Sequence, residues 1–184
     1  LTFLINQTSL LGTDVNGYFS QRWKKFGFSF LTANSFQKAT DVNKDSFSDL
    51  PKTQTFNLAP TFYYYFNPTA TLRFGLNGTF DNRKGGDMKV LENKADTLHK
   101  FFEENLSNRI STQLKFDKQF ANNKSLTIKN SISYFDRAIN QNTTAFKGNQ
   151  ISSYSEASFN FKIKKHQFVT GINFITENFS EDST

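Results

Sequence analysis

The sequence has no cysteine, and this absence removes several kinds of site at once. Without thiols there is no disulfide framework, no cysteine-bound zinc and no thiol nucleophile. Long apolar runs are absent as well, because no stretch reaches the ~18 apolar residues that a membrane-spanning helix requires. The sequence therefore excludes a membrane anchor built from helices.

The residue patterns of common enzymes are also missing. The two histidines, His99 and His166, lie far apart in the sequence, and neither has the spacing of a zinc site. No serine stands in the strand–turn–helix context of a hydrolase nucleophile. The run Gly85-Gly86-Asp87 lacks the following lysine and helix of a phosphate-binding loop. We therefore expect a protein that is not an enzyme.

Hydrophobic residues make up only 36% of the chain, against the roughly 45–50% of an ordinary globular protein. The mean hydropathy is −0.56, yet phenylalanine occurs 23 times. A polar average with many phenylalanines is typical of a transmembrane β-barrel, since only every second residue of each strand must be apolar there.

Positive charge is in excess but scattered. The net charge of +6 comes from lysines and arginines spread along all 184 residues, without a basic block. Such scatter is more typical of a solvated surface than of a nucleic-acid site. We expect no nucleic-acid partner.

The stretch from Thr53 to Arg83 shows the clearest periodicity. Apolar and polar residues alternate on both sides of the turn at Asn67-Pro68, and a side-chain period of two predicts extended strands with one apolar and one polar face. The apolar positions are Phe56, Leu58, Pro60, Phe62, Tyr64, Phe66, Leu72, Phe74, Leu76 and Phe80. Two such strands around a short turn form a β-hairpin.

Three more hairpins are predicted around short turns at Lys24-Lys25, residues 121–124 and residues 164–166. Loop residues fill 12–17, and longer polar connections are predicted at Asp41–Lys52, Arg83–Leu106 and Arg137–Gln150. Short turns at one end and long loops at the other are typical of outer-membrane barrels. A Greek-key sandwich, the alternative for a soluble β-protein, gives no reason for this alternation. The sequence thus predicts an all-β fold: an antiparallel, up-and-down transmembrane β-barrel segment of about nine strands with long extracellular loops.

The loop Asp41–Asp49 is a candidate metal site. Oxygen ligands recur at every second position, so the side chains and one carbonyl could turn toward a hard cation such as calcium. The candidate ligands are Asp41, Asn43, Asp45, Phe47 and Asp49. Ser46 and Lys52 depart from the EF-hand pattern at its sixth and twelfth positions. The alternative is a solvated loop of residues that favour turns.

Two further regions could contact a ligand. On the polar parity of the strands lie Arg73, Arg109, Lys115, Lys129 and Lys162. In a barrel they would face the lumen, where they could pair with Asp117 or with a plug, or attract an anionic ligand. The extracellular loops around Arg83, Asp87 and Arg137 are the predicted ligand-binding region, because recognition usually lies on loops carried by a rigid scaffold.

Several segments resemble the barrel of TonB-dependent outer-membrane receptors of the Bacteroidetes type, especially the ferric-siderophore and colicin receptors. These segments are Asp41–Lys52, Phe56–Pro60, Phe62–Asn67, Leu76–Asp87 and Asn130–Arg137. The resemblance implies uptake of a scarce ligand, such as an iron–siderophore complex or cobalamin, powered by an inner-membrane TonB complex. It also implies a 22-stranded barrel closed by an N-terminal plug.

The chain departs from that plan, because it holds only about nine strands and has no recognisable plug or TonB-box peptide. We therefore expect residues 1–184 to be part of a single outer-membrane β-barrel domain, located in the bacterial outer membrane and in contact with its lipid bilayer. The TonB complex would be reached through the missing N-terminal part. The alternative is an extracellular calcium-binding β-sheet adhesin or structural protein.

Overall fold

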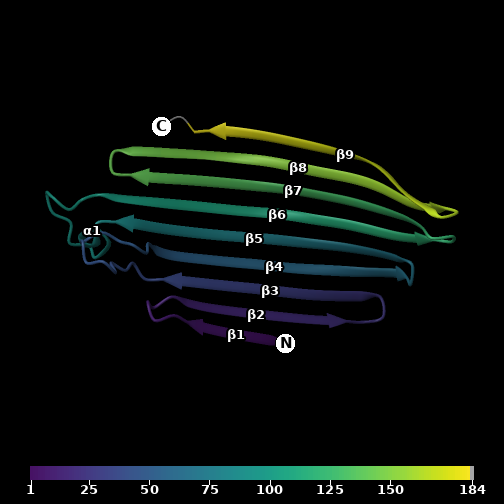
Figure 1. Cartoon of the computed structure of the whole chain (residues 1–184), viewed down its shortest axis with the longest axis horizontal. Helices are drawn as coiled ribbons and strands as arrows, with labels where there is room; N and C mark the ends of the chain where they lie inside the picture. The colour runs from purple at the N-terminus through teal and green to yellow at the C-terminus, as the bar shows by residue number, and fades with distance from the viewer. Residues whose placement is uncertain (183–184) are drawn as a thin grey trace.

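The computed structural model describes residues 1–182 and consists of one antiparallel sheet of nine strands (Figure 1). The strands lie side by side in sequence order, each hydrogen-bonded to the next. They are β1 (Thr2–Gln7), β2 (Thr13–Arg22), β3 (Phe26–Gln37), β4 (Lys52–Asn67), β5 (Ala70–Gly86), β6 (Phe102–Phe120), β7 (Lys124–Gln141), β8 (Thr144–Ile163) and β9 (His166–Glu181). One short helix, α1 (Met88–Leu91), follows β5. The prediction of about nine antiparallel strands in up-and-down order is confirmed.

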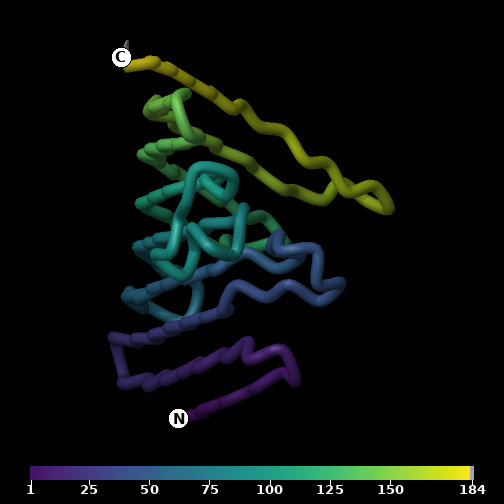
Figure 2. The backbone as a smooth tube through the Cα atoms, turned by 90° about the vertical axis from the view of Figure 1, so that its left-hand side faces the viewer, coloured from purple at the N-terminus to yellow at the C-terminus, as the bar shows by residue number. Residues whose placement is uncertain are grey.

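The sheet is open. Figure 2 shows a single twisted layer, with β1 at one side and β9 at the other. Within residues 1–182 these two edge strands do not pair, so the described part of the chain does not close into a barrel.

Connections at the two ends of the sheet differ. We call one end the turn end, where residues 23–25, 68–69, 121–123 and 164–165 join the strands. The other is the loop end, with connections at residues 8–12, 38–51, 87–101 and 142–143 (Figure 1). The longest connections, 38–51 and 87–101, therefore lie at the same end, as the sequence predicts.

Three loop predictions are wrong in their extent. The expected loop Arg137–Gln150 is strand on both sides of a two-residue turn at Asn142-Thr143. The expected loop Arg83–Leu106 shrinks to 87–101, because β5 continues to Gly86 and pairs with β6 from Phe102. Strand β2 starts at Thr13, inside the expected loop 12–17. In each case backbone pairing continues where apolar side chains no longer alternate strictly with polar ones, so the period that reveals a strand is lost.

The sheet has almost no interior of its own. Among residues 1–182 the only buried apolar side chain is that of Ala70, and the buried polar one is that of Thr61. A single layer buries neither face, and stable domains cover an apolar sheet face with a second layer. Something other than the described residues must therefore cover the apolar side chains of this sheet.

Candidate functional site: the two faces and the loop end

The strand register separates the side chains into two faces. Directly paired residues share a face, and the pairs Phe28–Phe62, Phe62–Phe74 and Phe74–Leu114 show that one face is apolar from β3 to β6. We call this the apolar face. It continues across β7, β8 and β9 through Ile128, Ile132, Ile151, Ala157, Phe159, Ile172 and Phe174. The opposite side, which carries Arg73, Arg109, Lys115 and Lys129, is the polar face.

Charge on the apolar face is confined to the two ends of the sheet. The register places seven charged residues of the strands on this face: Lys52, Lys84, Glu104, Asp136 and Lys147 toward the loop end, and Lys118 and Lys124 toward the turn end. On β7, Lys124 and Asp136 are separated by about 40 Å of strand at ~3.4 Å per residue. At a strand tilt of about 40°, the uncharged band is about 30 Å tall, close to the hydrocarbon thickness of a bilayer.

Aromatic rings gather on the apolar face at the turn end. The ring centroids of Phe26 and Tyr64 are 5.1 Å apart, those of Tyr64 and Phe66 4.6 Å, and those of Phe66 and Phe116 6.1 Å. A second chain of contacts joins Phe120, Phe159, Phe161 and Phe168. Trp23, in the first turn, is 53% exposed. Aromatic rows at the border of an apolar band are a feature of membrane interfaces.

On the polar face, several predicted basic residues have acidic or aromatic neighbours. Lys115 Nζ lies 2.9 Å from Asp117 Oδ2, which confirms the predicted pairing with Asp117. Lys129 Nζ lies 2.9 Å from Glu156 Oε1, and Tyr154 donates a hydrogen bond to the same carboxylate. Arg73, Lys115 and Lys129 stand directly opposite one another on β5, β6 and β7. Lys115 and Lys129 have acidic partners, so this cationic row is partly neutralised. Like charges in direct cross-strand pairs repel one another.

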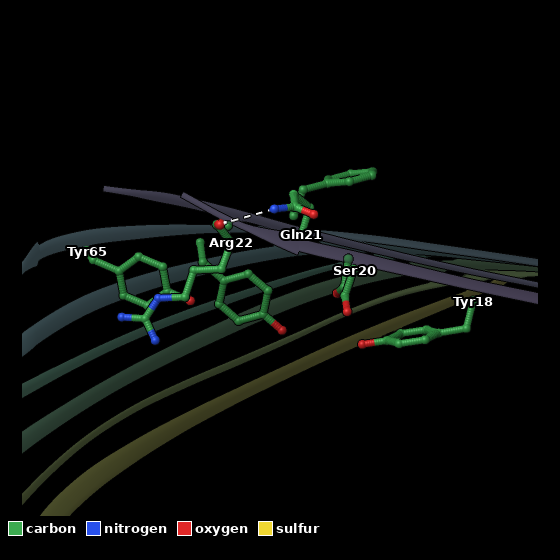
Figure 3. Close-up of a pocket in the computed structure, with 9 residues that line it drawn as sticks. Tyr18, Ser20, Gln21, Arg22 and Tyr65 are labelled. Atoms are coloured by element: carbon green, nitrogen blue, oxygen red, sulfur yellow. Dashed lines mark hydrogen bonds between the residues drawn. The ribbon is translucent and has the colours of Figure 1, made fainter. Parts of the chain in front are cut away.

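A hollow of about 470 Å³ lies on the polar face at the turn end, between β2, β3 and β4. Figure 3 shows Tyr18, Ser20 and Arg22 on one side of β2 and Gln21 on the other, and the following strands curve toward the side of Tyr18. The Arg22 guanidinium stands 4.1 Å from the centre of the Tyr65 ring. The polar face is thus the concave face. Sequence reasoning missed this hollow because its residues meet only through strand pairing.

The loops 38–51 and 87–101 pack against each other at the loop end. The backbone N–H of Ser48 donates to the Gly86 carbonyl, and the N–H of Met88 donates to the Ser46 carbonyl. The rings of Phe47 and Phe101 stack with centroids 5.6 Å apart. These contacts make one structural unit from two segments that are far apart in the sequence.

The three residues chosen to mark ligand-binding loops take different places. Asp87 lies in loop 87–101, where its carboxylate accepts a hydrogen bond from the Phe101 N–H. Arg83 and Arg137 lie in β5 and β7 rather than in loops, both on the polar face. Arg83 Nε is 2.8 Å from Asp81 Oδ2, and Arg137 donates to Asn105 Oδ1 at 3.1 Å. Asn105 of β6 is the strand partner of Arg83 and the hydrogen-bond acceptor of Arg137, so both arginines lie beside this residue.

The side chains of the candidate calcium loop are engaged with its own backbone. The Asp41 carboxylate accepts hydrogen bonds from the N–H groups of Lys44, Asp45 and Ser46. Asp49 accepts from Val42 and Asn43, and Asp45 accepts from Phe47. These are the local bonds by which Asp and Asn stabilise turns. Calcium would have to share oxygens that already hold the loop, and its binding stays a prediction.

Two searches of the described residues complete the site description. In residues 1–182, no group of three or more His, Cys, Asp or Glu side chains is arranged to hold a metal ion. Over the same residues, no helix has the length and apolar character needed to cross a membrane.

Asp96 organises the far part of loop 87–101. The Lys89 ammonium lies 2.7 Å from Asp96 Oδ2 and, with the N–H groups of Leu98 and His99 donating to Oδ1, holds the pKa of Asp96 well below its usual range. A carboxylate with a lowered pKa in the folded state contributes stability that is present above its ordinary pKa and lost as the pH falls through the folded value.

We therefore expect the loop around Asp96 to keep its structure at neutral pH and to lose it only at a pH well below the ordinary aspartate value of about 3.9. The test is an NMR titration of the His99 and Leu98 amide signals in the detergent-solubilised chain. Asp96→Asn serves as the control, because it removes the titrating group and should abolish this acid step. If the unchanged chain and Asp96→Asn showed the same acid transition, Asp96 would not be the group whose protonation opens the loop.

Comparison with protein-family models, with curated proteins and with solved structures finds no match for this chain. The resemblance to TonB-dependent receptors rests on the sequence segments alone.

Proposed function

We propose that this chain forms part of the wall of a bacterial outer-membrane β-barrel, with the apolar face toward lipid and the polar face toward the lumen. The observation that carries the proposal is the uncharged apolar band, bounded by charged residues at both ends and by an aromatic row at the turn end. A lipid-exposed barrel wall requires this distribution, because charge is costly at the middle of a bilayer and tolerated near its surfaces.

Curvature and exposure support the same orientation. The polar face is concave, as the lumen face of a barrel wall is (Figure 3). On the apolar face, side chains in mid-strand stay open to the surroundings: Phe74 is 36% exposed, Ile132 50% and Ile172 75%. Contiguous exposed apolar surface of this size marks an interaction site. Lipid covers such a face without any further element of the chain.

We further propose that the protein is a TonB-dependent receptor that takes up a scarce ligand such as a ferric siderophore. The sequence resemblance supports this proposal, and so does the joined pair of loops at the loop end. Ligand capture would fall to these loops and to the adjacent Arg83 and Arg137, whose side chains lie on the polar face beneath them. The cationic row of Arg73, Lys115 and Lys129 would favour an anionic ligand in the lumen.

Trp23, the single tryptophan, allows a direct test. We expect the purified chain to be β-rich and monodisperse in detergent and to aggregate without it, by circular dichroism and light scattering. In vesicles, lipids brominated close to the headgroup should quench Trp23 more than lipids brominated near the chain ends, because Trp23 lies at the border of the band.

A β-rich, monodisperse monomer in plain buffer would overturn the membrane location. The apolar face would then be covered by protein. The extracellular β-protein, with calcium held at Asp41–Asp49, would become the better interpretation of the same sequence.

A further inference from the structure

The turn end of the sheet carries an excess of positive charge. Within the four turns and the four strand residues on each side of them, the chain has nine lysines and arginines but a single acidic residue, Asp117. The same count around the connections at the loop end gives nine basic and nine acidic residues. The excess positive charge of the whole chain, +6, therefore arises at the turn end.

Six of these basic residues form what we call the turn-end rim: Lys24, Lys25, Lys118, Lys124, Lys164 and Lys165. All but Lys118 are exposed. Asp117 does not neutralise them, because it lies on the polar face and pairs with Lys115 and Thr127. In residues 1–182 no ion pair is found for any lysine of the rim.

The rim borders the aromatic row of the apolar face. Lys118 Nζ lies 6.0 Å from the centre of the Phe120 ring and 3.1 Å from the Thr69 hydroxyl, so its stem lies along apolar surface while its ammonium reaches the turn. Lys118 and Lys124 belong to the apolar face itself. Long basic side chains beside aromatic rings are suited to the headgroup layer, where the apolar stem stays in hydrocarbon and the charge reaches the surface.

We propose that the turn-end rim binds the phosphate groups of anionic phospholipids in the leaflet that the turn end enters. This inference rests on the proposed membrane location and adds a preference for lipid charge and a fixed orientation. Anionic lipid is the partner that matches both features of the rim, because it offers negative charge in a layer directly beside hydrocarbon. The loop end, with balanced charges, has no such preference.

The experiment compares vesicles of phosphatidylcholine with vesicles that also contain phosphatidylglycerol. Three forms of the whole chain are used: the unchanged chain, a rim variant with Lys24→Gln, Lys25→Gln, Lys164→Gln and Lys165→Gln, and a matched control. The control carries Lys38→Gln, Lys44→Gln, Lys52→Gln and Lys100→Gln, which remove the same charge at the loop end. Partition is measured by co-sedimentation, and insertion by the quenching of Trp23.

We expect the unchanged chain and the control to prefer the anionic vesicles, and raised salt to weaken the preference. Attraction to an anionic membrane surface changes partition by roughly 5-fold per lysine. The rim variant removes four lysines, so it should lose roughly 600-fold in partition to anionic vesicles and keep its insertion into neutral ones.

Equal partition of the unchanged chain into both vesicle types would overturn the lipid preference and leave the membrane location intact. So would an equal loss in the rim variant and the control. If the chain stayed a soluble monomer and inserted into neither type of vesicle, the proposed membrane location itself would be wrong. Retention on single-stranded DNA that the rim substitutions abolish, without any lipid preference, would assign the rim to nucleic acid instead.

Discussion

Ile132→Arg is expected to destabilise the folded sheet in a bilayer by about 2–4 kcal/mol, or roughly 30- to 1,000-fold in the folding equilibrium. Ile132 lies at the middle of β7 on the apolar face, opposite Thr112 and Ser153, and is 50% exposed. In the proposed orientation its side chain enters the centre of the hydrocarbon layer, where an arginine has no water and no partner. The measurement is denaturant-dependent folding into neutral vesicles, followed by circular dichroism and Trp23 fluorescence.

Ser133→Arg is the matched control, one residue away on the same strand. Ser133 pairs with Ser111 and Ser152 on the polar face, so its side chain points to the lumen in the proposed orientation. An arginine there remains solvated, and we expect a change within about 0.5 kcal/mol, as for ordinary surface substitutions. The pair of variants therefore separates the two faces with the same introduced residue.

A soluble sheet covered by protein would give another pattern. If Ile132→Arg and Ser133→Arg had equal effects in vesicles, or if Ile132→Arg left insertion unchanged, lipid would not lie against the apolar face. The proposed orientation would then be wrong, whatever the chain's solubility in detergent.

The hairpins were predictable because their central residues alternate. In β4 and β5, apolar residues such as Phe62 and Phe74 occupy every second position, and the register places them directly opposite each other on one face. A period of two follows from strand geometry alone, so no tertiary contact is needed to recognise it. The short turns predicted at Lys24-Lys25 and residues 121–124 follow from the same rule, since they interrupt this period.

Strand ends were not predictable in the same way. Beyond Asp136 the apolar residues of β7 and β8 no longer keep to the apolar face, since Ile139 and Phe146 pair with each other on the polar face. Asn142 completes the turn between the two strands at φ 44°. No hydrophobic period marks such residues, although their backbones still form ladder hydrogen bonds. Outside the apolar band, strand pairing is therefore visible only in the structure.

For the site residues, too, the face was predictable from the sequence and the contacts across strands were not. That Arg73 and Lys115 share a face was predictable from their parity within strands, but their direct opposition depends on the register between β5 and β6. Glu156 as the partner of Lys129, and Arg22 above Tyr65, involve strands whose relative positions the sequence does not state. The packing of loop 38–51 on loop 87–101 is of this kind too, since it joins segments some forty residues apart.

Gly86→Ala is expected to disrupt the loop end, by about 1–3 kcal/mol for the backbone conformation and more for the steric clash. Gly86 adopts φ +129°, a conformation that residues with a side chain rarely take. A Cβ at this position would lie 2.4 Å from the Phe101 carbonyl oxygen and 2.7 Å from the Phe102 Cα. Both are backbone atoms, so relief requires β5 and β6 to separate where the two long loops join.

The consequence should be local, and hydrogen exchange is the measurement that reveals it. Ser48 N–H donates to the Gly86 carbonyl, and Gly86 N–H donates to Ser48 Oγ, so both amides should lose protection in Gly86→Ala. Gly85→Ala is the control for the backbone clash, because its Cβ would meet the Ser48 hydroxyl at 3.2 Å rather than backbone atoms. It can shift the bond from the Gly86 N–H to this hydroxyl, but it should leave the Ser48 N–H protected. Unchanged protection of both amides in Gly86→Ala would show that the two loops hold together without this glycine. Lost protection at both amides, with the strands intact elsewhere, would show that the contact between the two proposed ligand-capturing loops depends on Gly86.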